Sequence, residues 1–532
     1  MNRYEFIVIG AGPAGLSGAI EAAKAGMKVL VIDENHRPGG QLFKQIHKFF
    51  GSREHKAKIR GFMIGEKLLE EATSLGVEVR LDTTVMGIYK NREIICSKED
   101  RIEHIKGDHI LVAAGASENM IPFEGWTLPG VIGAGAAQTM MNLHGVRPGK
   151  KILMVGSGNV GLVVSYQLMQ AGCEVVAIID AAPRIGGYGV HASKVARTGV
   201  PFYLSHTVVQ ANGDDHVTSA TIGKVDANWK IVEGSQKTLE VDTICIAVGL
   251  SPMSQLLRTA GCLMAEVPQK GGLIPVCVDY TQTSLPGIYA AGDVAGIEEA
   301  SSAMIQGRIA GAQAARNSGY ISEEEFLVRV SDLKKSLGQL REGMFGHEMK
   351  GRTDIVKTEE GFTLSKSLLE KGYIDESELA SFPAAVVCEN EYEVHPIIEC
   401  TQNIPCNPCQ DVCSKGCIIV GDKITKLPII SDTATCTGCA MCVASCPGQA
   451  IFLMKKNKDG SAIISLPYEF LPIPEKGSKG MALDRKGEAV CEAEVVLVQS
   501  AKALDHTVVL SIMVPAEYAD KARFFRAGGE KL

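Results

Sequence analysis

The chain has 532 residues, of which 45% are hydrophobic and 22% charged, and its formal net charge at pH 7 is -7. Its length accommodates about three or four domains. The mild acidity argues against nucleic acid or an anionic membrane as the main partner. No apolar run approaches the roughly 20 residues of a membrane span, and a strand pattern begins at once. We therefore expect a cytoplasmic protein without a signal peptide.

Two similar segments lie in the first half of the chain, at residues 4–34 and 150–180. Each predicts a strand, a glycine-rich turn, a helix and a second strand that ends on an acidic residue. Strands that alternate with helices indicate parallel-sheet units. The sequence therefore predicts an α/β protein with two Rossmann-like dinucleotide-binding domains.

The first glycine-rich turn has the G-x-G-x-x-G spacing, with Gly10, Gly12 and Gly15. The first glycine permits the tight turn, the second lets the backbone approach a pyrophosphate, and the third lets the helix pack on the strand. The diphosphate would then meet the N-terminus of the helix. Asp33, at the end of the second strand, is expected to accept hydrogen bonds from the ribose hydroxyls.

Three further segments, RPGGQL (37–42), ILVAAGA (110–116) and GIYAAGD (287–293), resemble FAD-contacting segments of two-dinucleotide-domain flavoproteins. These are the thioredoxin reductase and glutathione reductase superfamily. The resemblance implies FAD in the first fold, with Asp293 near the ribityl-phosphate side of the flavin and residues 39–41 near the isoalloxazine. The FAD-binding residues expected in this fold are Gly10, Gly12, Pro13, Ala14, Gly15, Asp33, Glu34, Gly39, Gly40, Gln41, Ala114, Gly115, Gly292 and Asp293.

The second glycine-rich turn contains Gly156, Gly158 and Gly161 and is followed by Asp180. In the superfamily such a fold binds NAD(P)H, and an acid at this position favours NAD(H) over NADP. Relatives that receive electrons from elsewhere keep the fold without using nicotinamide. Binding of NAD(H) and a fold that binds no nicotinamide are both open here.

A redox cysteine pair, which disulfide reductases of this superfamily need beside the flavin, is missing. Residues 37–50 contain no cysteine, and residues 151–250 contain only Cys173 and Cys245, far apart. Electrons on the flavin therefore need another route. The sequence identifies no catalytic acid or base, and His47, which could neighbour the flavin, fits a packing or surface role better.

The chain has 16 cysteines, and nine of them lie between Cys400 and Cys446. Such clustering in a cytosolic protein favours metal binding over disulfides. The scattered cysteines are expected to be buried thiols without chemistry; they include Cys96, Cys173, Cys245 and Cys262.

Residues 436–451 (CTGCAMCVASCPGQAI) match the C-x2-C-x2-C-x3-C-P run of two-cluster ferredoxins, in which the fourth cysteine serves the other cluster. Zinc would need C-x2-C pairs separated by a longer loop. The earlier run, 399–419, is irregular and has five cysteines. Aligning the ends of both runs makes Cys400 a ligand and Cys417 the spare, whereas a start at Cys406 would use Cys417. The preferred sets are Cys400, Cys406, Cys409 and Cys446 for cluster one, and Cys413, Cys436, Cys439 and Cys442 for cluster two.

Residues 121–161 and 287–315 resemble FAD-containing alpha-type subunits of multi-subunit amino-acid dehydrogenases, such as dye-linked proline dehydrogenase, opine oxidase and hydrogen cyanide synthase. The resemblance implies an FAD-dependent electron-transfer oxidoreductase in a hetero-oligomer, where a partner flavoprotein oxidises the amine. One alternative is a self-contained NADH-dependent reductase that delivers electrons through its clusters to ferredoxin or another carrier. A noncatalytic assembly subunit is another.

The expected domains follow these motifs along the chain. They are an FAD domain (1–120 and 275–318), an NAD(P)-type Rossmann domain (121–274), a helical connection (319–390), a ferredoxin-like domain with two [4Fe-4S] clusters (391–465) and a β-rich C-terminal tail (466–532).

Overall fold

The computed structural model describes residues 2–99, 101–342, 365–385 and 392–528, and they form two compact units. The first unit takes its described residues from 1–118 and 249–358, and the second from 119–248 and 359–532. Parts of the expected helical connection, 343–364 and 386–390, lie outside the described residues. Both units contain parallel strands that alternate with helices, which confirms the α/β class.

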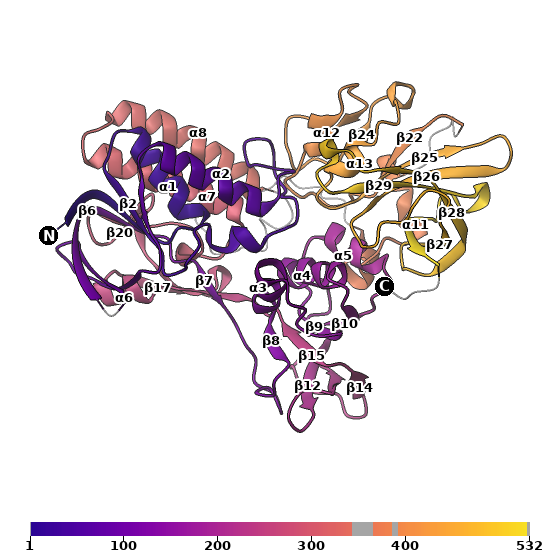
Figure 1. The fold of residues 1–532 in the computed structure, drawn as a ribbon, viewed down its shortest axis with the longest axis horizontal. Coiled ribbons are helices and arrows are strands. Elements are labelled where there is room, and N and C mark those ends of the chain that lie inside the picture. The colour runs from indigo at the N-terminus through magenta and orange to yellow at the C-terminus, as the bar shows by residue number, and fades with distance from the viewer. Residues whose placement is uncertain (1, 100, 343–364, 386–391, 529–532) are drawn as a thin grey trace. The chain divides into compact units, whose positions relative to one another are not determined.

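The first unit is built on a sheet of nine described strands (Figure 1). Its parallel centre has the order β21-β6-β1-β2-β3. The burial of Phe6 to Ile9 of β1 and of all of β2 is typical of parallel strands covered on both faces. The parallel strands are β1 (Asn2–Ile9), β2 (Val29–Ile32), β3 (Glu78–Arg80), β6 (Arg101–Val112) and β21 (Ile288–Ala290). Antiparallel additions are β4 (Thr84–Ile88), β5 (Glu93–Lys98), β19 (Cys277–Asp279) and β20 (Gln282–Thr283).

Two helices of the first unit, α1 (Pro13–Lys24) and α7 (Ala300–Asn317), pack through small residues. A Cβ atom at Gly307 would lie 2.0 Å from the carbonyl oxygen of Ala14, so a larger side chain would separate the helices. The other described helices of this unit are α2 (Gly61–Ser74), α6 (Gln255–Ala260) and α8 (Glu323–Arg341). Its short antiparallel pairs are β7 (Ala116–Glu118) with β16 (Leu250–Pro252), and β17 (Met264–Val267) with β18 (Gly272–Pro275).

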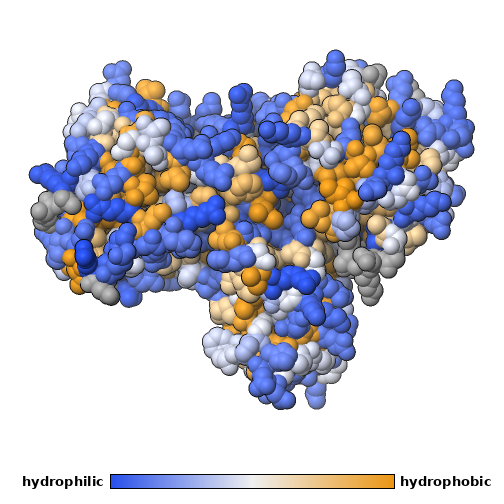
Figure 2. Space-filling view, in the orientation of Figure 1, coloured by the Kyte–Doolittle hydropathy of each residue, from blue (hydrophilic) through white to orange (hydrophobic). Residues whose placement is uncertain are grey.

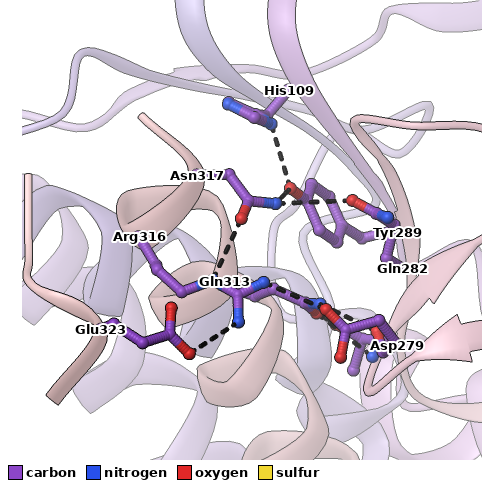
Figure 3. A network of polar contacts seen from close by, with 9 residues as sticks. His109, Asp279, Gln282, Tyr289, Gln313, Arg316, Asn317 and Glu323 are labelled. Carbon is purple, nitrogen blue, oxygen red and sulfur yellow. Dashed lines mark hydrogen bonds and ion pairs between the residues drawn. The ribbon is translucent and has the colours of Figure 1, made fainter. Parts of the chain in front are cut away.

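Polar side chains tie the C-terminal end of α7 to the neighbouring strands (Figure 3). Asn317 Nδ2 donates to the Tyr289 hydroxyl at 2.8 Å, and this hydroxyl lies 3.0 Å from His109 Nδ1. Arg316 donates to Asp279 Oδ2 at 3.0 Å. Burial lowers the pKa of His109 and raises the pKa of Tyr289 to about 12, so both side chains are neutral at pH 7. This network fixes the helix that follows the GIYAAGD segment.

The second unit begins with a parallel sheet of the order β11-β10-β9-β15-β8. Its strands are β8 (Val131–Gly133), β9 (Lys151–Val155), β10 (Glu174–Asp180), β11 (Phe202–Leu204) and β15 (Thr243–Ile246). Its helices are α3 (Ala134–His144), α4 (Asn159–Gln170) and α5 (Gly189–Ala196). An antiparallel extension consists of β12 (His206–Asn212), β13 (Ser219–Lys224) and β14 (Lys237–Glu240).

An antiparallel sheet of the order β22-β25-β26-β29-β28-β27-β30 forms the C-terminal part of the second unit. Its strands are β22 (His395–Ile398), β25 (Ile451–Lys456), β26 (Ser461–Tyr468), β27 (Lys479–Leu483), β28 (Ala489–Gln499), β29 (Val508–Pro515) and β30 (Phe524–Ala527). The tail strands thus extend the sheet that flanks the cysteine segment, and the boundary expected at 465 falls inside β26.

The cysteine segment lies between β22 and β25. Its elements are α12 (Pro408–Val412), β23 (Ile418–Ile419), β24 (Ile429–Ile430) and α13 (Met441–Ser445). Before it come the short helices α10 (Lys366–Lys371) and α11 (Glu376–Leu379).

One hydrophobic core joins the second Rossmann sheet to the C-terminal sheet. Tyr166 of α4 meets Phe470 edge to face, with 5.0 Å between ring centroids. Phe452 of β25 and Phe524 of β30 belong to the same core. The second Rossmann fold and the C-terminal sheet are therefore packed together as one body.

The surface seen in Figure 2 is mostly hydrophilic. It also has small hydrophobic patches, one of which lies over the C-terminal sheet. Leu497 of β28 and Met513 of β29 are exposed apolar side chains of that sheet. Among the described helices, none has the length and apolar character needed to cross a membrane.

Candidate functional site

The first glycine-rich turn connects β1 to α1. A Cβ atom at Gly10 would lie 2.4 Å from the carbonyl oxygen of Ala113, and one at Gly15 would lie 1.9 Å from that of Gly10. At Gly12 the nearest atom would be Gly40 Cα, 4.0 Å away. The first and third glycines are thus required by packing, whereas the middle glycine leaves room for a ligand beside the backbone.

The N-terminus of α1 has no side-chain cap and no acidic residue in its first turn. Its free N–H groups and the helix dipole favour an anion. The expected residues Pro13 and Ala14 form this first turn. Together with the open side of Gly12, the turn fits the pyrophosphate of a dinucleotide.

Asp33 is 7% exposed, and both of its carboxylate oxygens already accept hydrogen bonds within the protein. Its Oδ2 accepts from Ala11 N–H at 2.6 Å, and its Oδ1 accepts from Asn35 N–H at 2.8 Å. The neighbouring Glu34 is exposed. The geometry makes Asp33 a support for the glycine-rich turn and leaves Glu34 as the exposed carboxylate beside it. Both acids were expected to bind FAD, but the sequence does not show which of them faces inward.

The other expected FAD segments meet at the same edge of the sheet. Gly39 N–H donates to Ala11 O at 2.7 Å. A Cβ atom at Gly40 would lie 3.0 Å from Gly12 Cα, and one at Gly292 would lie 2.9 Å from Ala14 Cβ. Gln41 follows this pair of glycines, Asp293 follows Gly292, and Ala114 and Gly115 follow the end of β6. This edge is formed by the carboxyl ends of the parallel strands, where open α/β sheets bind ligands.

The second glycine-rich turn, between β9 and α4, has the same construction. Cβ atoms at Gly156 and Gly161 would lie 2.2 Å from Ala247 O and 2.0 Å from Gly156 O, whereas one at Gly158 would meet nothing within 4 Å. The N-terminus of α4 again lacks a side-chain cap and an acidic first turn. The turn can therefore also receive an anion.

Asp180 is turned inward, like Asp33. Its Oδ2 accepts from the Ser157 N–H at 2.7 Å and hydroxyl at 2.6 Å, and its Oδ1 accepts from Ala182 N–H at 2.9 Å. The residue that corresponds to Glu34 is Ala181. The second fold thus lacks the additional carboxylate of the first, which weakens the expected ribose site for NAD(H).

A second similarity between the two folds was missed at the sequence level. RPGG (37–40) and RIGG (184–187) each begin four residues after the inward-facing aspartate. Gly187 N–H donates to Ser157 O at 2.9 Å, and Gly39 N–H, one position earlier in the aligned segment, donates to Ala11 O at 2.7 Å. Alignment of the two segments beyond their acidic ends could have revealed this repeat.

The thiol of Cys409 lies near those of Cys400 and Cys446. The pKa of Cys409 is raised mainly by burial and further by these two neighbours. The pKa of Cys400 is raised to about 12, mainly by burial and further by Cys446. Cys406 lies in the same run, with its N–H donating to Ile424 O at 2.8 Å. Three cysteines of the expected first set are thus neighbours across the two runs.

A second group contains Cys436, Cys439, Cys442 and Cys413. Burial raises the pKa of Cys442, with further contributions from Cys436 and Cys439. Burial also raises the pKa of Cys436, and the neighbouring Cys439 and Cys413 raise it further. Cysteines of the expected second set therefore also come together from both runs.

Cys417 also lies in the second group. It is 2% exposed, and burial together with the neighbouring Cys436 raises its pKa to about 11. Both Cys413 and Cys417 act on Cys436 as neighbours. Since Cys413 and Cys417 both lie beside Cys436, the choice of Cys413 as the ligand stays a prediction.

The turn after Cys446 directs backbone N–H groups at its sulfur. Ala450 N–H donates to Cys446 Sγ at 3.5 Å, and Gly448 and Gln449 also contribute backbone bonds. Such bonds stabilise a thiolate over a thiol. Within the described ranges, no three His, Cys, Asp or Glu side chains converge on one metal-ion position. In a [4Fe-4S] cluster each thiolate binds a different iron, so its ligands surround the cluster instead of a single ion.

The remaining expectations concern side chains without assigned chemistry. Cys96, Cys173, Cys245 and Cys262 are buried, as predicted. His47 stacks on Phe49 with 5.5 Å between ring centroids, consistent with a packing role.

Comparisons with known proteins agree with this geometry. Residues 4–319 match the pyridine nucleotide-disulphide oxidoreductase family, and the chain belongs to it. Subunit HcnB of hydrogen cyanide synthase from Pseudomonas aeruginosa is 29% identical to this chain. The match covers 57% of this chain and 69% of that protein. An opine oxidase subunit from Rhizobium meliloti is 30% identical, over 58% of this chain and 70% of that protein.

Among solved structures, thioredoxin reductase of T. acidophilum has a similar fold. The TM-score is 0.50 at 22% identity, over 60% of this chain and 99% of that chain. The fold and the relatives identify the chain as an FAD-dependent oxidoreductase of the amino-acid dehydrogenase subunit type.

Proposed function

We propose that the chain is the electron-transfer subunit of an amine or amino-acid dehydrogenase complex. It would pass electrons between a partner flavoprotein subunit, its own FAD and two [4Fe-4S] clusters. The relatives in the comparisons are named as subunits, which supports a hetero-oligomer. The buried thiols outside the cysteine segment fit the cytoplasm, where disulfides are rare. The order of the domains inferred from the sequence is part of this proposal.

The grouping of the cysteines carries the proposal. Cys400 and Cys409 of the first run lie near Cys446 of the second, and Cys413 of the first lies near Cys436 of the second. Crossed ligation of this kind is the property of two-cluster ferredoxins. The proposed ligands are Cys400, Cys406, Cys409 and Cys446 for cluster one, and Cys413, Cys436, Cys439 and Cys442 for cluster two.

When bound, FAD and the clusters supply the redox chemistry, and the chain's own residues bind and orient them. Cys173 and Cys245 are 1% and 0% exposed, so they form no accessible disulfide pair. A route through the clusters therefore replaces the disulfide exit of related reductases.

A self-contained NADH-dependent reductase that passes electrons to ferredoxin or another carrier is the alternative. The open side of Gly158 and the uncapped α4 favour it. Ala181 and the inward-facing Asp180 argue against it.

Anaerobic purification with its partner subunit tests the proposal. About eight irons and about eight sulfides per chain are expected. A content of about four of each would mean that the chain holds only one cluster. The amine substrate should bleach the flavin of this chain through the partner, whereas NADH should not. Flavin bleaching by NADH with the isolated chain would support the reductase instead.

A further inference from the structure

Buried charges lie beside the proposed ligands Cys400 and Cys446. Glu399 Oε1 accepts hydrogen bonds from Arg485 Nη2 and Arg523 Nε, both at 2.6 Å. These three side chains are nearly inaccessible to solvent. Two guanidinium groups thus face one carboxylate oxygen, which makes Glu399 the anion of a buried ion-pair cluster.

A third guanidinium, Arg197, directly follows α5 of the second Rossmann fold and is 3% exposed. Its Nη2 donates to Gln449 O at 3.0 Å, while its buried Nε has no hydrogen-bond partner among the described residues. Burial lowers the pKa of Arg197 to about 10, and the nearby Glu399, Tyr166 and Cys446 oppose this effect. Arg197 remains a cation at neutral pH.

This region therefore has more buried positive than negative charge. Arg197, Arg485 and Arg523 share one buried carboxylate, that of Glu399, with Asp520 as a further acid acting on Arg523. A buried cation is costly unless an anion or strong acceptor lies nearby. The arrangement therefore suits an anionic group at Cys446.

Unpartnered donors beside Cys400 are an independent observation. The Thr401 hydroxyl and Gln402 Nε2 are buried and have no hydrogen-bond partner in the part of the chain that the structure describes. Thr401 is 0% and Gln402 2% exposed. Both groups can donate to thiolate or sulfide sulfur, and buried donors in proteins are normally satisfied.

A [4Fe-4S] cluster with four thiolates is an anion, and reduction makes it more negative by one charge. We propose that the positive charge of Arg197 raises the reduction potential of the cluster held by Cys400, Cys406, Cys409 and Cys446. This inference rests on the proposed function. A nearby cation in a low-dielectric region stabilises the reduced state more than the oxidised one.

The second group of cysteines has different surroundings. Cys439 is exposed, and Asp432 is among the charges that act on Cys417. Arg197 acts on Cys446 of the first group. Its effect should therefore fall mainly on one of the two cluster potentials.

Redox titration of the anaerobic full-length protein, followed by electron paramagnetic resonance, tests the inference. Arg197→Gln should lower one potential, with about a tenfold loss in the equilibrium constant for reduction, or about 59 mV for a one-electron couple. The other potential should move much less. Arg197→Lys, which keeps the charge, should stay close to the wild type.

Tyr166→Phe is the matched control without a change in charge, because the Tyr166 hydroxyl donates to Gln449 Oε1 at 2.9 Å. It should leave both potentials unchanged. Equal shifts of both potentials in Arg197→Gln, no shift at all, or the same shift in Arg197→Lys or Tyr166→Phe would overturn the inference. If Arg197→Gln does not assemble clusters, the inference is tested by Arg197→Lys alone. Because this variant keeps the charge, it must assemble both clusters and have the wild-type potential. Absence of clusters in the wild type would instead refute the proposed function.

Discussion

Asp180 binds Ser157 twice, through the backbone N–H at 2.7 Å and the hydroxyl at 2.6 Å. This carboxylate therefore supports the second glycine-rich turn from within. In the first fold, Asp33 makes the matching bond to Ala11 N–H, and the next residue, Glu34, is exposed. The two turns are built alike, but only the first has a second acid beside it.

Ala181→Glu should increase affinity for NADH, because it restores the carboxylate that the first fold has at Glu34. A hydrogen bond to a charged group contributes about 1.5–3 kcal/mol, so affinity should rise by roughly 10- to 150-fold. Calorimetric titration of NADH into the anaerobic protein measures the effect. Ala181→Gln is the neutral control. Tight binding by the wild type, with no gain in Ala181→Glu, would contradict the assignment.

Gly12→Ala and Gly10→Ala should separate cofactor binding from folding. Gly12 has a φ of -79°, which any residue can adopt, and its added Cβ would lie 4.0 Å from the nearest atom. This variant should keep its stability but lose FAD affinity by tenfold or more, because a methyl group blocks the close approach of the pyrophosphate. Flavin absorbance after gel filtration measures retention.

Gly10 has a φ of +103°, and its added Cβ would lie 2.4 Å from Ala113 O. Gly10→Ala should therefore destabilise the first unit by about 2–5 kcal/mol. Comparison of the two variants in thermal unfolding without FAD provides the check. Equal loss of stability in both would show that Gly12 also has a packing role.

Local patterns were sufficient to predict the two Rossmann folds. The glycine spacing depends on backbone contacts within each strand-turn-helix unit, so Gly10, Gly15, Gly156 and Gly161 could be interpreted without tertiary structure. Side-chain direction could not be predicted in this way. Asp33 faces inward because Ala11 N–H is available to it, and this depends on the folded turn.

Long-range packing explains the rest. Arg197 reaches Gln449 only because α5 packs near the turn that follows Cys446. No periodicity in either segment links positions so far apart in the chain. The pattern of the tail likewise predicted strands but not the strands with which they pair. In the structure β26 pairs with both β25 and β29.

Cys413→Ser and Cys417→Ser should distinguish the two registers of the irregular run. If Cys413 is the ligand, its loss should remove about four of about eight irons, and Cys417→Ser should keep nearly all of them. Iron and sulfide analysis of anaerobic protein measures this. Both thiols lie beside Cys436, so neither variant introduces a distant change. Iron loss in Cys417→Ser alone would reverse the register.

His55 should make the first unit less stable in mild acid. Its Nδ1 accepts from Ser52 N–H at 3.1 Å, and its Nε2 lies 3.0 Å from Ser336 Oγ. Burial lowers the pKa of His55, although Ser336 and Glu54 oppose this effect. The unfolded chain therefore binds a proton more readily than the folded one. The stability that neutral His55 contributes is present above its unfolded pKa of about 6.5 and is lost as pH falls towards the lower folded pKa.

His55→Asn should cost about 1–3 kcal/mol at about pH 7.5, because it breaks the bonds to Ser52 and Ser336. Between about pH 7.5 and about 5.5, thermal unfolding of the variant should depend less on pH than that of the wild type. The difference between the two proteins should shrink as pH falls, since the wild type loses the advantage of a neutral buried imidazole. His36→Asn, at an exposed histidine of the same unit, is the control and should change neither quantity. A difference that grows on acidification would mean that protonated His55 stabilises the fold, which would reverse the direction of its pKa shift.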